Sequence, residues 1–474
     1  MLRIRLAGYR LVSQLFMGAA MILAGATASA ADHPLPTDDK FKHLGVASCA
    51  GSSCHGSASP LEDSTVLQNE FVTWKREDAH SKAYDILLGK QSKRIARNLG
   101  LDQPAHEHPD CLICHSDYVK DASRQGKRYK KEDGVGCESC HGGAERWLGL
   151  HVSGATHEEN VKAGMYPTDE PAARAKLCLS CHLGNKDRVI THRIMGAGHP
   201  RLSFELDTFT IIEPAHFSVD DDYKERKGVH TAARTWAVGQ ISASVTFLDA
   251  LVSTPHKGLF PELVFFDCQA CHHPMSYSVL EKHPGRAWQP RSTNGLGPGV
   301  VRLNDSNLLM LSAIAQGVSK DMSKQIRKAV RAMHLATGSG WKATKKAAQH
   351  IRALVIELNG RLPANLDAAA IQAMLSGVMS DGIHGQHRDY AAAEQGFLAL
   401  DSLLSSLEVD GAITGSHSDR MRAAMDKLYM TLRTHEKGYR PSKDGYRPYE
   451  DDKDVYKAGK YVAAMKQLAA AFSR

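Results

Sequence analysis

The chain has 474 residues, a formal net charge of +7, 10 cysteines and 25 histidines. Three of the arginines lie within the first ten residues, and without these three the charge falls from +7 to about +4. So small an excess does not indicate a nucleic-acid-binding protein.

The first thirty residues have the pattern of an export signal. Arg3, Arg5 and Arg10 precede an apolar run over residues 15–24, and Ala28, Ser29 and Ala30 form an A-x-A cleavage site. We therefore expect a signal peptide over residues 1–30, cleavage near Ala30 and a periplasmic protein. The alternative is an uncleaved anchor, although the run is short for a membrane span. We expect no transmembrane segment after this signal.

Five motifs use every cysteine in the chain. Four have the form Cys-x-x-Cys-His, and the first is a stretched version with four residues between its cysteines. In each, two thiols can bond the two vinyl groups of a haem, and the histidine can reach the iron as proximal ligand. The cysteines are Cys49, Cys54, Cys111, Cys114, Cys137, Cys140, Cys178, Cys181, Cys268 and Cys271, and the histidines are His55, His115, His141, His182 and His272. The sequence predicts five covalently bound haem c groups.

Other uses of paired cysteines explain this pattern less well. A zinc ribbon needs no histidine after every second cysteine, and a thioredoxin-like redox pair occurs once. Disulfides explain an even count of cysteines but not the five histidines. For the stretched motif the alternative is a small disulfide loop, although Gly51, Ser52 and Ser53 allow the two extra residues to bulge away from a haem. Ten ionised propionates would bring the oxidised holoprotein to about −1 and the reduced one to about −6.

We predict a mainly α fold in two parts. Residues 31–300 hold every cysteine and 19 of the 25 histidines, so we expect a pentahaem cytochrome c domain with little regular structure and almost no sheet. Local helices are predicted over residues 66–88, with a break near Asp78, and over 231–252. Residues 301–474 are expected to form a haem-free helical bundle, after a proline-containing linker at 282–299. Its predicted helices span residues 307–335, 342–358, 366–379, 388–407, 418–433 and 454–472.

Five irons need five further ligands if each is closed by two histidines, and the haem part offers 14 histidines outside the motifs. This surplus favours bis-histidine ligation over methionine ligation by Met195 or Met275. Gly196 and Gly198 would let the backbone around the 192–199 segment approach a flat cofactor closely. The preferred distal candidates are His80, His151, His192, His199 and His216. Weaker candidates are His106, His108, His230 and His273.

Residues 45–200 resemble the cytochrome c-554 family of multihaem cytochromes. The matching features are Trp74 before His80, the sequence GVGCESCHG at residues 134–142, and a histidine at 151. The resemblance implies an electron carrier with haems in close pairs, and it implies that His151 is the distal ligand of the first haem. The fifth motif and the long bundle depart from that family.

Two functions remain open from the sequence. The leading hypothesis is a carrier that transfers electrons between redox partners, either other cytochromes or an oxidoreductase. The alternative is an enzyme acting on hydroxylamine, nitrite or sulfite at one five-coordinate haem, with His199, Arg201 or His216 as helpers. Ammonia-forming nitrite reductases are disfavoured, because no motif here ends in lysine. A third reading makes the bundle a docking platform for a partner.

Overall fold

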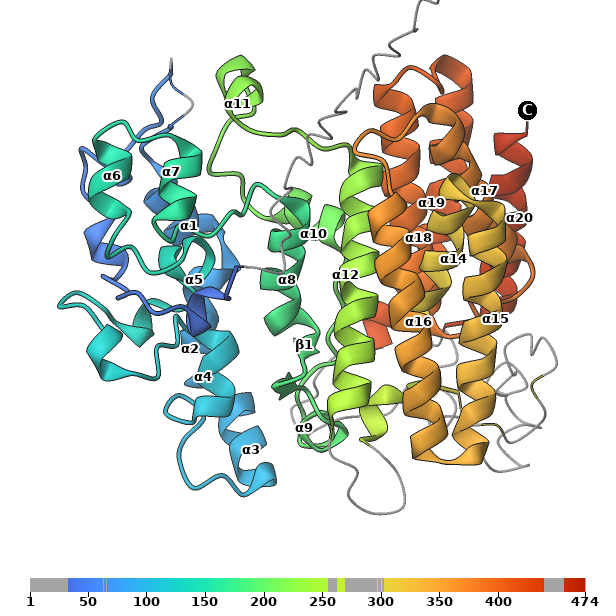
Figure 1. Cartoon of the computed structure of the whole chain (residues 1–474), viewed down its shortest axis with the longest axis horizontal. Helices are drawn as coiled ribbons and strands as arrows, with labels where there is room; N and C mark the ends of the chain where they lie inside the picture. The colour runs from blue at the N-terminus through green and yellow to red at the C-terminus, as the bar shows by residue number, and fades with distance from the viewer. Residues whose placement is uncertain are drawn as a thin grey trace, which may run out of the picture.

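A computed structural model describes residues 33–62, 64, 66–254, 262–268, 296, 300, 302–438 and 456–473. The predicted signal peptide, Cys271, His272 and His273 lie outside these residues. In Figure 1 the chain runs from short helices on the left, through a central long helix, to a group of long helices on the right.

The haem-motif part is built from short helices joined by turns. The only described sheet has two antiparallel strands, β1 (Gly184–Asn185) and β2 (Arg188–Val189). The mainly α fold with almost no sheet is therefore confirmed. The helices are α1 (Glu70–Glu77), α2 (Ala83–Leu87), α3 (Lys90–Leu99), α4 (Pro109–His115), α5 (Cys137–His141), α6 (Leu148–Val152), α7 (His157–Lys162), α8 (Pro171–His182), α9 (His192–Gly196), α10 (Leu206–Ile212) and α11 (Asp221–Arg226), with 3-10 turns at Pro36–Asp38, Val46–Ser48, Ala79–Lys82, Ala122–Arg124, Lys131–Asp133 and Leu263–Phe265.

The predicted break near Asp78 is present. Helix α1 ends there because Asp78 has extended backbone, and its side chain accepts a hydrogen bond from the backbone N–H of His80. This capping starts the next turn and fixes the position of His80 relative to α1.

The C-terminal part is a bundle of long helices, as predicted. They are α14 (Ser306–Val318), α15 (Lys320–Ala336), α16 (Trp341–Arg361), α17 (Ala368–Ile383), α18 (Tyr390–Val409), α19 (Gly415–Gly438) and α20 (Ala458–Phe472), with a 3-10 turn at Thr337–Ser339 after α15. The single helix expected over 307–335 was wrong: Ser319 is extended and its hydroxyl accepts from the N–H of Met322, so a new helix begins there. Helix α16 also runs past residue 358, where the predicted helix ends, and continues to Arg361.

Helix α12 (Ala232–Ser253) joins the two parts. Trp236, Ile241 and Leu248 are buried in the same apolar core as α14 to α20, while Ala243 packs with Leu179 of α8 and Leu206 of α10 in a second cluster. Its position between the two groups of helices is visible in Figure 1. Helix α12 therefore contributes buried side chains both to the core of the bundle and to the cluster between the haem-motif helices.

Among the described helices, α12 alone is long and apolar enough to cross a membrane by length and composition. Length and composition alone are weak evidence for a span, so the expected absence of a transmembrane segment after the signal stays a prediction. The mean hydropathy of its most apolar 18-residue window is 1.2, and 67% of that window is buried inside the protein. A helix packed on two sides needs apolar residues around most of its circumference, which explains the composition.

Candidate haem sites

Three of the regular motifs have the same local structure, at the end of a helix. Helices α4, α5 and α8 each end at the proximal histidine of a motif, so both cysteines and the histidine lie within the last turns of a helix. Helices α4 and α8 start with proline at the first helical position, where the missing N–H costs nothing. A helical turn therefore presents two thiols and an imidazole together.

The stretched motif forms a tight loop in place of a helix. The N–H of His55 donates to the carbonyl of Cys49 at 3.2 Å, and the N–H of Gly56 donates to that of Gly51 at 2.9 Å. A Cβ atom at Gly56 would lie 2.1 Å from the carbonyl oxygen of Ala50, so only glycine fits there. The extra residues are thus absorbed within the loop, and both described cysteines are free thiols.

Each of the four proximal histidines in the described motifs faces a second histidine from a distant part of the chain. The ring centroids are 6.1 to 6.4 Å apart in all four cases. The pairs are His55 with His151 at 6.2 Å, His115 with His199 at 6.4 Å, His141 with His216 at 6.4 Å, and His182 with His80 at 6.1 Å.

This spacing matches two imidazoles on opposite sides of one metal ion. A nitrogen ligand lies about 2 Å from such an ion and about 1 Å from the centre of its own ring, so two trans ligands have centroids about 6 Å apart. Direct stacking of two rings would bring their planes closer. Four repeats of one separation, each beside a pair of thiols, fit the haem group.

Hydrogen bonds hold several of these rings through Nδ1. The Nδ1 atom of His55 contacts Glu70 Oε2 at 2.9 Å, and that of His80 contacts Asp78 Oδ1 at 2.9 Å. His115 donates to the carbonyl of Ala83 at 3.1 Å. His151 and His199 contact the carbonyls of Trp147 and Pro200 at 3.4 and 2.8 Å. Because Nδ1 is the donor, Nε2 keeps its lone pair for iron.

Burial favours the form of the ring that can bind a metal. Burial, together with neighbouring His216, lowers the pKa of His141 to about 3. Burial, together with His80, lowers the pKa of His182 to about 4. A metal-binding imidazole must be neutral, and both rings are neutral at physiological pH.

The motifs adjoin in pairs that alternate along the chain. The thiols of Cys49 and Cys137 are in contact, which joins the first motif to the third. The thiols of Cys114 and Cys181 are also in contact, which joins the second to the fourth. Cys140 lies near Cys178 and Cys181, and these, after burial itself and after Glu213, help to raise its pKa. The spatial order of the sites is first, third, fourth, second.

A buried polar network fixes the third motif, and sequence reasoning missed it. Glu138, between the two cysteines of that motif, is 2% exposed and accepts from the N–H groups of Leu44, Gly45 and Ala144 at 2.7 to 2.8 Å. Nearby, buried His43 contacts Asp117 at 2.9 Å. In the sequence, an acidic residue between the two cysteines of a haem motif looks like a surface residue. The sequence therefore gives no sign that Glu138 is buried and accepts three backbone hydrogen bonds.

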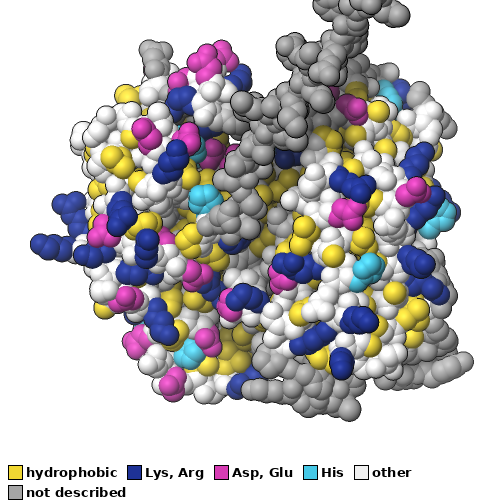
Figure 2. Space-filling view, viewed as in Figure 1, with side chains coloured by type: hydrophobic (Ala, Val, Ile, Leu, Met, Phe, Trp, Pro, Cys, Tyr) yellow, Lys and Arg dark blue, Asp and Glu magenta, His cyan; other side chains and the backbone are white. Residues whose placement is uncertain are grey.

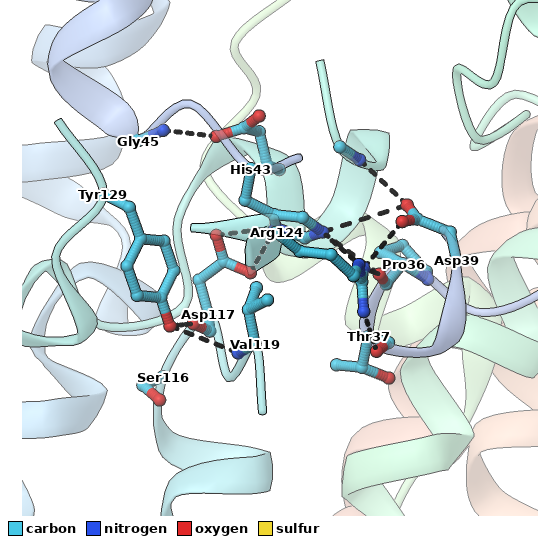
Figure 3. A network of polar contacts seen from close by, with 12 residues as sticks. Pro36, Thr37, Asp39, His43, Gly45, Ser116, Asp117, Val119, Arg124 and Tyr129 are labelled. Atoms are coloured by element: carbon cyan, nitrogen blue, oxygen red, sulfur yellow. Dashed lines mark hydrogen bonds and ion pairs between the residues drawn. The ribbon is translucent and has the colours of Figure 1, made fainter. Parts of the chain in front are cut away.

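Arg124 completes this network. It donates to Asp39 at 2.7 Å and to the carbonyls of Thr37 and Phe41 at 3.2 and 3.1 Å, and Tyr129 donates to the carbonyl of Asp117 (Figure 3). One possible metal-ligand atom from each of His43, Asp117 and Glu138 lies within 4.8 Å of the others, but the Glu138 oxygens accept backbone N–H groups. The cluster therefore acts as a clamp between residues 36–45 and the third motif.

The fifth motif is described only at Cys268, which is exposed. His192, one of the preferred distal candidates, starts α9, and its backbone N–H donates to Glu262 at 2.7 Å, which brings α9 close to the segment before Cys268. Burial lowers the pKa of Arg201, but Glu394 and, to a lesser extent, nearby Cys268 raise it, so Arg201 lies near the fifth motif. Of the weaker candidates, His108 caps α4 by accepting from the N–H of Asp110 at 3.2 Å.

Comparison with known proteins agrees with this geometry. The family described as "Cytochrome c554 and c-prime" matches residues 48–142. The cytochrome c-554 of Nitrosomonas europaea is 28% identical over 191 residues, which cover 38% of this chain and 72% of the relative. No solved structure matches the chain. The segment with the first three haem-attachment motifs is therefore similar to the cytochrome c-554 family, and this similarity supports a c-type cytochrome that works in electron transfer.

Proposed function

We propose that the protein is a periplasmic pentahaem cytochrome that transfers electrons between redox partner proteins through a chain of closely packed, mostly bis-histidine haems. The observation that carries the proposal is the set of four histidine pairs with ring centroids 6.1 to 6.4 Å apart. Haem iron with two histidine ligands is closed to substrates and alternates between its ferric and ferrous states.

The chain would hold each haem through one motif and one distant histidine. The first to fourth motifs would use His151, His199, His216 and His80, respectively, as distal ligands. The fifth would use Cys268, Cys271 and His272, with His192 as the proposed distal ligand. In this scheme the five predicted distal histidines each have one site.

The protein part contributes rigidity around the irons. Glu70 and Asp78 hold the rings of His55 and His80 through Nδ1. Phe204 and Phe209 pack against His182, with ring centroids 5.4 Å away in both cases. Fixed ligands and apolar surroundings keep water out and limit reorganisation, which favours rapid electron exchange over ligand binding.

The order of the sites supports a chain of haems that pass electrons from one to the next. The first and third motifs are in thiol contact, the third approaches the fourth, and the fourth is in thiol contact with the second. The Arg201 segment follows His199 of the second site and approaches Cys268 of the fifth. The proposed path therefore has the first haem at one end and the fifth at the other.

The enzyme alternative needs a five-coordinate iron. In each of the four motifs that the structure describes in full, the proximal histidine already faces a second histidine. His199 and His216, considered above as substrate helpers, are two of these partners. An open site would therefore have to be the fifth one.

Low-temperature EPR of the oxidised holoprotein, with haems counted by mass, tests the proposal. We expect five haems, an N-terminus near Ala31 and only low-spin ferric signals. Replacing His199 with alanine should convert one haem to high spin, while His384→Ala, a matched change at an exposed histidine of the bundle, should leave all five low-spin. A native high-spin iron, or fewer than five haems, would contradict the proposal.

A further inference from the structure

We infer that the cationic face of α3, together with Ile86 and Leu88, is the docking surface for an acidic redox protein that exchanges electrons at the second haem site. This inference rests on the proposed function. It names the class of partner and the haem site at which electrons are exchanged with it. The surface comprises Lys90, Lys93, Arg94, Arg97, Ile86 and Leu88, and is called the α3 surface below.

The charge of α3 has one sign. Four of its ten residues are lysine or arginine and none is acidic. Lys90, Lys93 and Arg97 are exposed and Arg94 is half-buried. No ion pair found among the described residues involves any of these four side chains. The acids of the loop that follows, Asp102, Glu107 and Asp110, instead face His106 and His108. The helix therefore offers uncompensated positive charge.

The opposite face of α3 packs on the second motif. Its buried Ala96 lies in one apolar cluster with Tyr84 and Leu87 of α2 and with Leu112, the residue that follows Cys111. Helix α2 is in turn bonded to the proximal ligand, because His115 donates to the carbonyl of Ala83 at 3.1 Å. The α3 surface therefore covers the proximal side of this site.

The same helix also holds the segment that carries the facing histidine. Gln91 donates to the carbonyl of Gly198 at 3.1 Å, and Asn98 donates to that of Ala197 at 3.0 Å. From α9, Arg193 donates back to the carbonyl of Leu99. His199 follows Gly198 directly. Helix α3 thus bridges both histidines of the second site, and a partner seated on it lies next to that site.

Apolar side chains just before α3, at the end of α2, supply the remaining feature of a docking surface. Ile86 is 59% exposed and Leu88 is 43% exposed, and both precede Lys90 closely in the sequence. An apolar patch beside charged residues is typical of interfaces between proteins, and charge complementarity speeds the encounter. Across the face drawn in Figure 2 both charge signs are mixed, so steering depends on local clusters such as this one.

The experiment compares two double charge reversals in the full holoprotein. Lys90→Glu with Lys93→Glu changes the α3 surface, and Lys460→Glu with Lys466→Glu makes the same change on exposed lysines of α20, on the opposite side of the molecule in Figure 1. The probe is a small acidic ferric cytochrome with one haem. Stopped-flow spectroscopy measures its rate of reduction by each pre-reduced variant at several ionic strengths.

We expect the α3 variant to lose about tenfold in the bimolecular rate constant at low salt, with the difference vanishing at high salt. The α20 variant should match the unchanged protein. An equal rate in both variants, or an equal loss in both, would overturn the inference. Binding to vesicles with anionic lipid that only the α3 reversal abolishes, with the probe rate unchanged, would assign the surface to a membrane and also overturn it.

The readouts separate this inference from the proposed function. Haem mass and the low-spin EPR signals report the proposed function and should be the same in both variants. If these fail in the unchanged protein, the proposed function fails. If they hold while the α3 variant reacts normally, only the docking surface is wrong.

Discussion

At the scale of single residues, Glu70 contacts His55, a proposed iron ligand. Its carboxylate lies 2.9 Å from His55 Nδ1, and hydrogen bonding to His55 helps to lower its pKa against the opposing effect of burial. A carboxylate partner makes an imidazole a stronger donor, which stabilises ferric iron.

Glu70→Gln should therefore raise the reduction potential of the first haem by about 60 mV, which is one tenfold change in a one-electron equilibrium. Spectroelectrochemical titration of the five haems measures this shift. Glu357→Gln, on the exposed side of the bundle, serves as the control. A first-haem potential that stays the same in Glu70→Gln would show that the contact has no electronic effect.

Glu205 makes a different prediction, on the pH dependence of stability. It is 1% exposed and caps α10 by accepting from the N–H groups of Asp207 and Thr208. Burial raises its pKa from 4.5 to about 7. The folded protein therefore binds this proton more tightly than the unfolded chain, so the contribution is full below pH 4.5 and is lost as the pH rises through about 7.

The free energy of unfolding should thus fall by on the order of 2–3 kcal/mol from this group between pH 5 and pH 8. Urea unfolding followed by circular dichroism at both pH values measures it, and Glu205→Gln should remove that part of the fall. In Glu408→Gln the fall should persist, because the bonds from Arg422 lower the pKa of Glu408 and keep it charged at both pH values.

At the scale of elements, the contact between α10 and α12 is set by a glycine. A Cβ atom at Gly239 would lie 2.6 Å from the Cβ of Leu206. Glycine inside a helix costs conformational entropy, so its place in α12 is explained by the close approach of α10. Helix α10 carries Phe209 onto His182, which makes this contact relevant to the fourth site.

Gly239→Ala should destabilise the protein by about 1–3 kcal/mol, because α10 must move away. Gly360→Ala in α16 is the matched change: nothing lies within 4 Å of its Cβ position, and it should stabilise the protein by about 0.5–1 kcal/mol. Thermal unfolding of both variants measures these effects. The two changes in the free energy of unfolding should have opposite signs. Destabilisation of equal size in both variants would contradict the packing explanation.

At the scale of the whole molecule, α12 links two parts that the sequence predicts as separate domains. The segment 201–204 is also tied to α18: Arg201 and Ser203 contact Glu394 at 2.9 and 2.5 Å, and Gln395 donates to the carbonyl of Phe204 at 3.1 Å. These bonds and the shared apolar core favour one cooperative unit around α12.

Hydrogen exchange followed by mass spectrometry tests this unit. We expect the amides of α12 to open with the same free energy as those of α14 and α18, because their side chains share one core. Exchange of α12 together with residues 48–142, and independently of the bundle, would instead support a domain boundary after residue 300.

Some features follow from the sequence alone because they depend on covalent chemistry or local periodicity. The haem-attachment motifs need fixed spacings of cysteine and histidine, and the bundle helices show their apolar repeat directly. The break at Asp78 is also local, since capping acts over two residues. The split at Ser319 is local too, but the apolar repeat continues across it and conceals it.

Only the tertiary structure decided which parts of the chain meet. A surplus of histidines does not tell which imidazole faces His115, because the two are brought together by α3 and α9 from distant segments. The burial of Glu138 and the double packing of α12 depend on the same kind of long-range contact. The sequence determined the chemistry of the haem sites, whereas packing between distant segments decided their partners, their order and their attachment to the bundle.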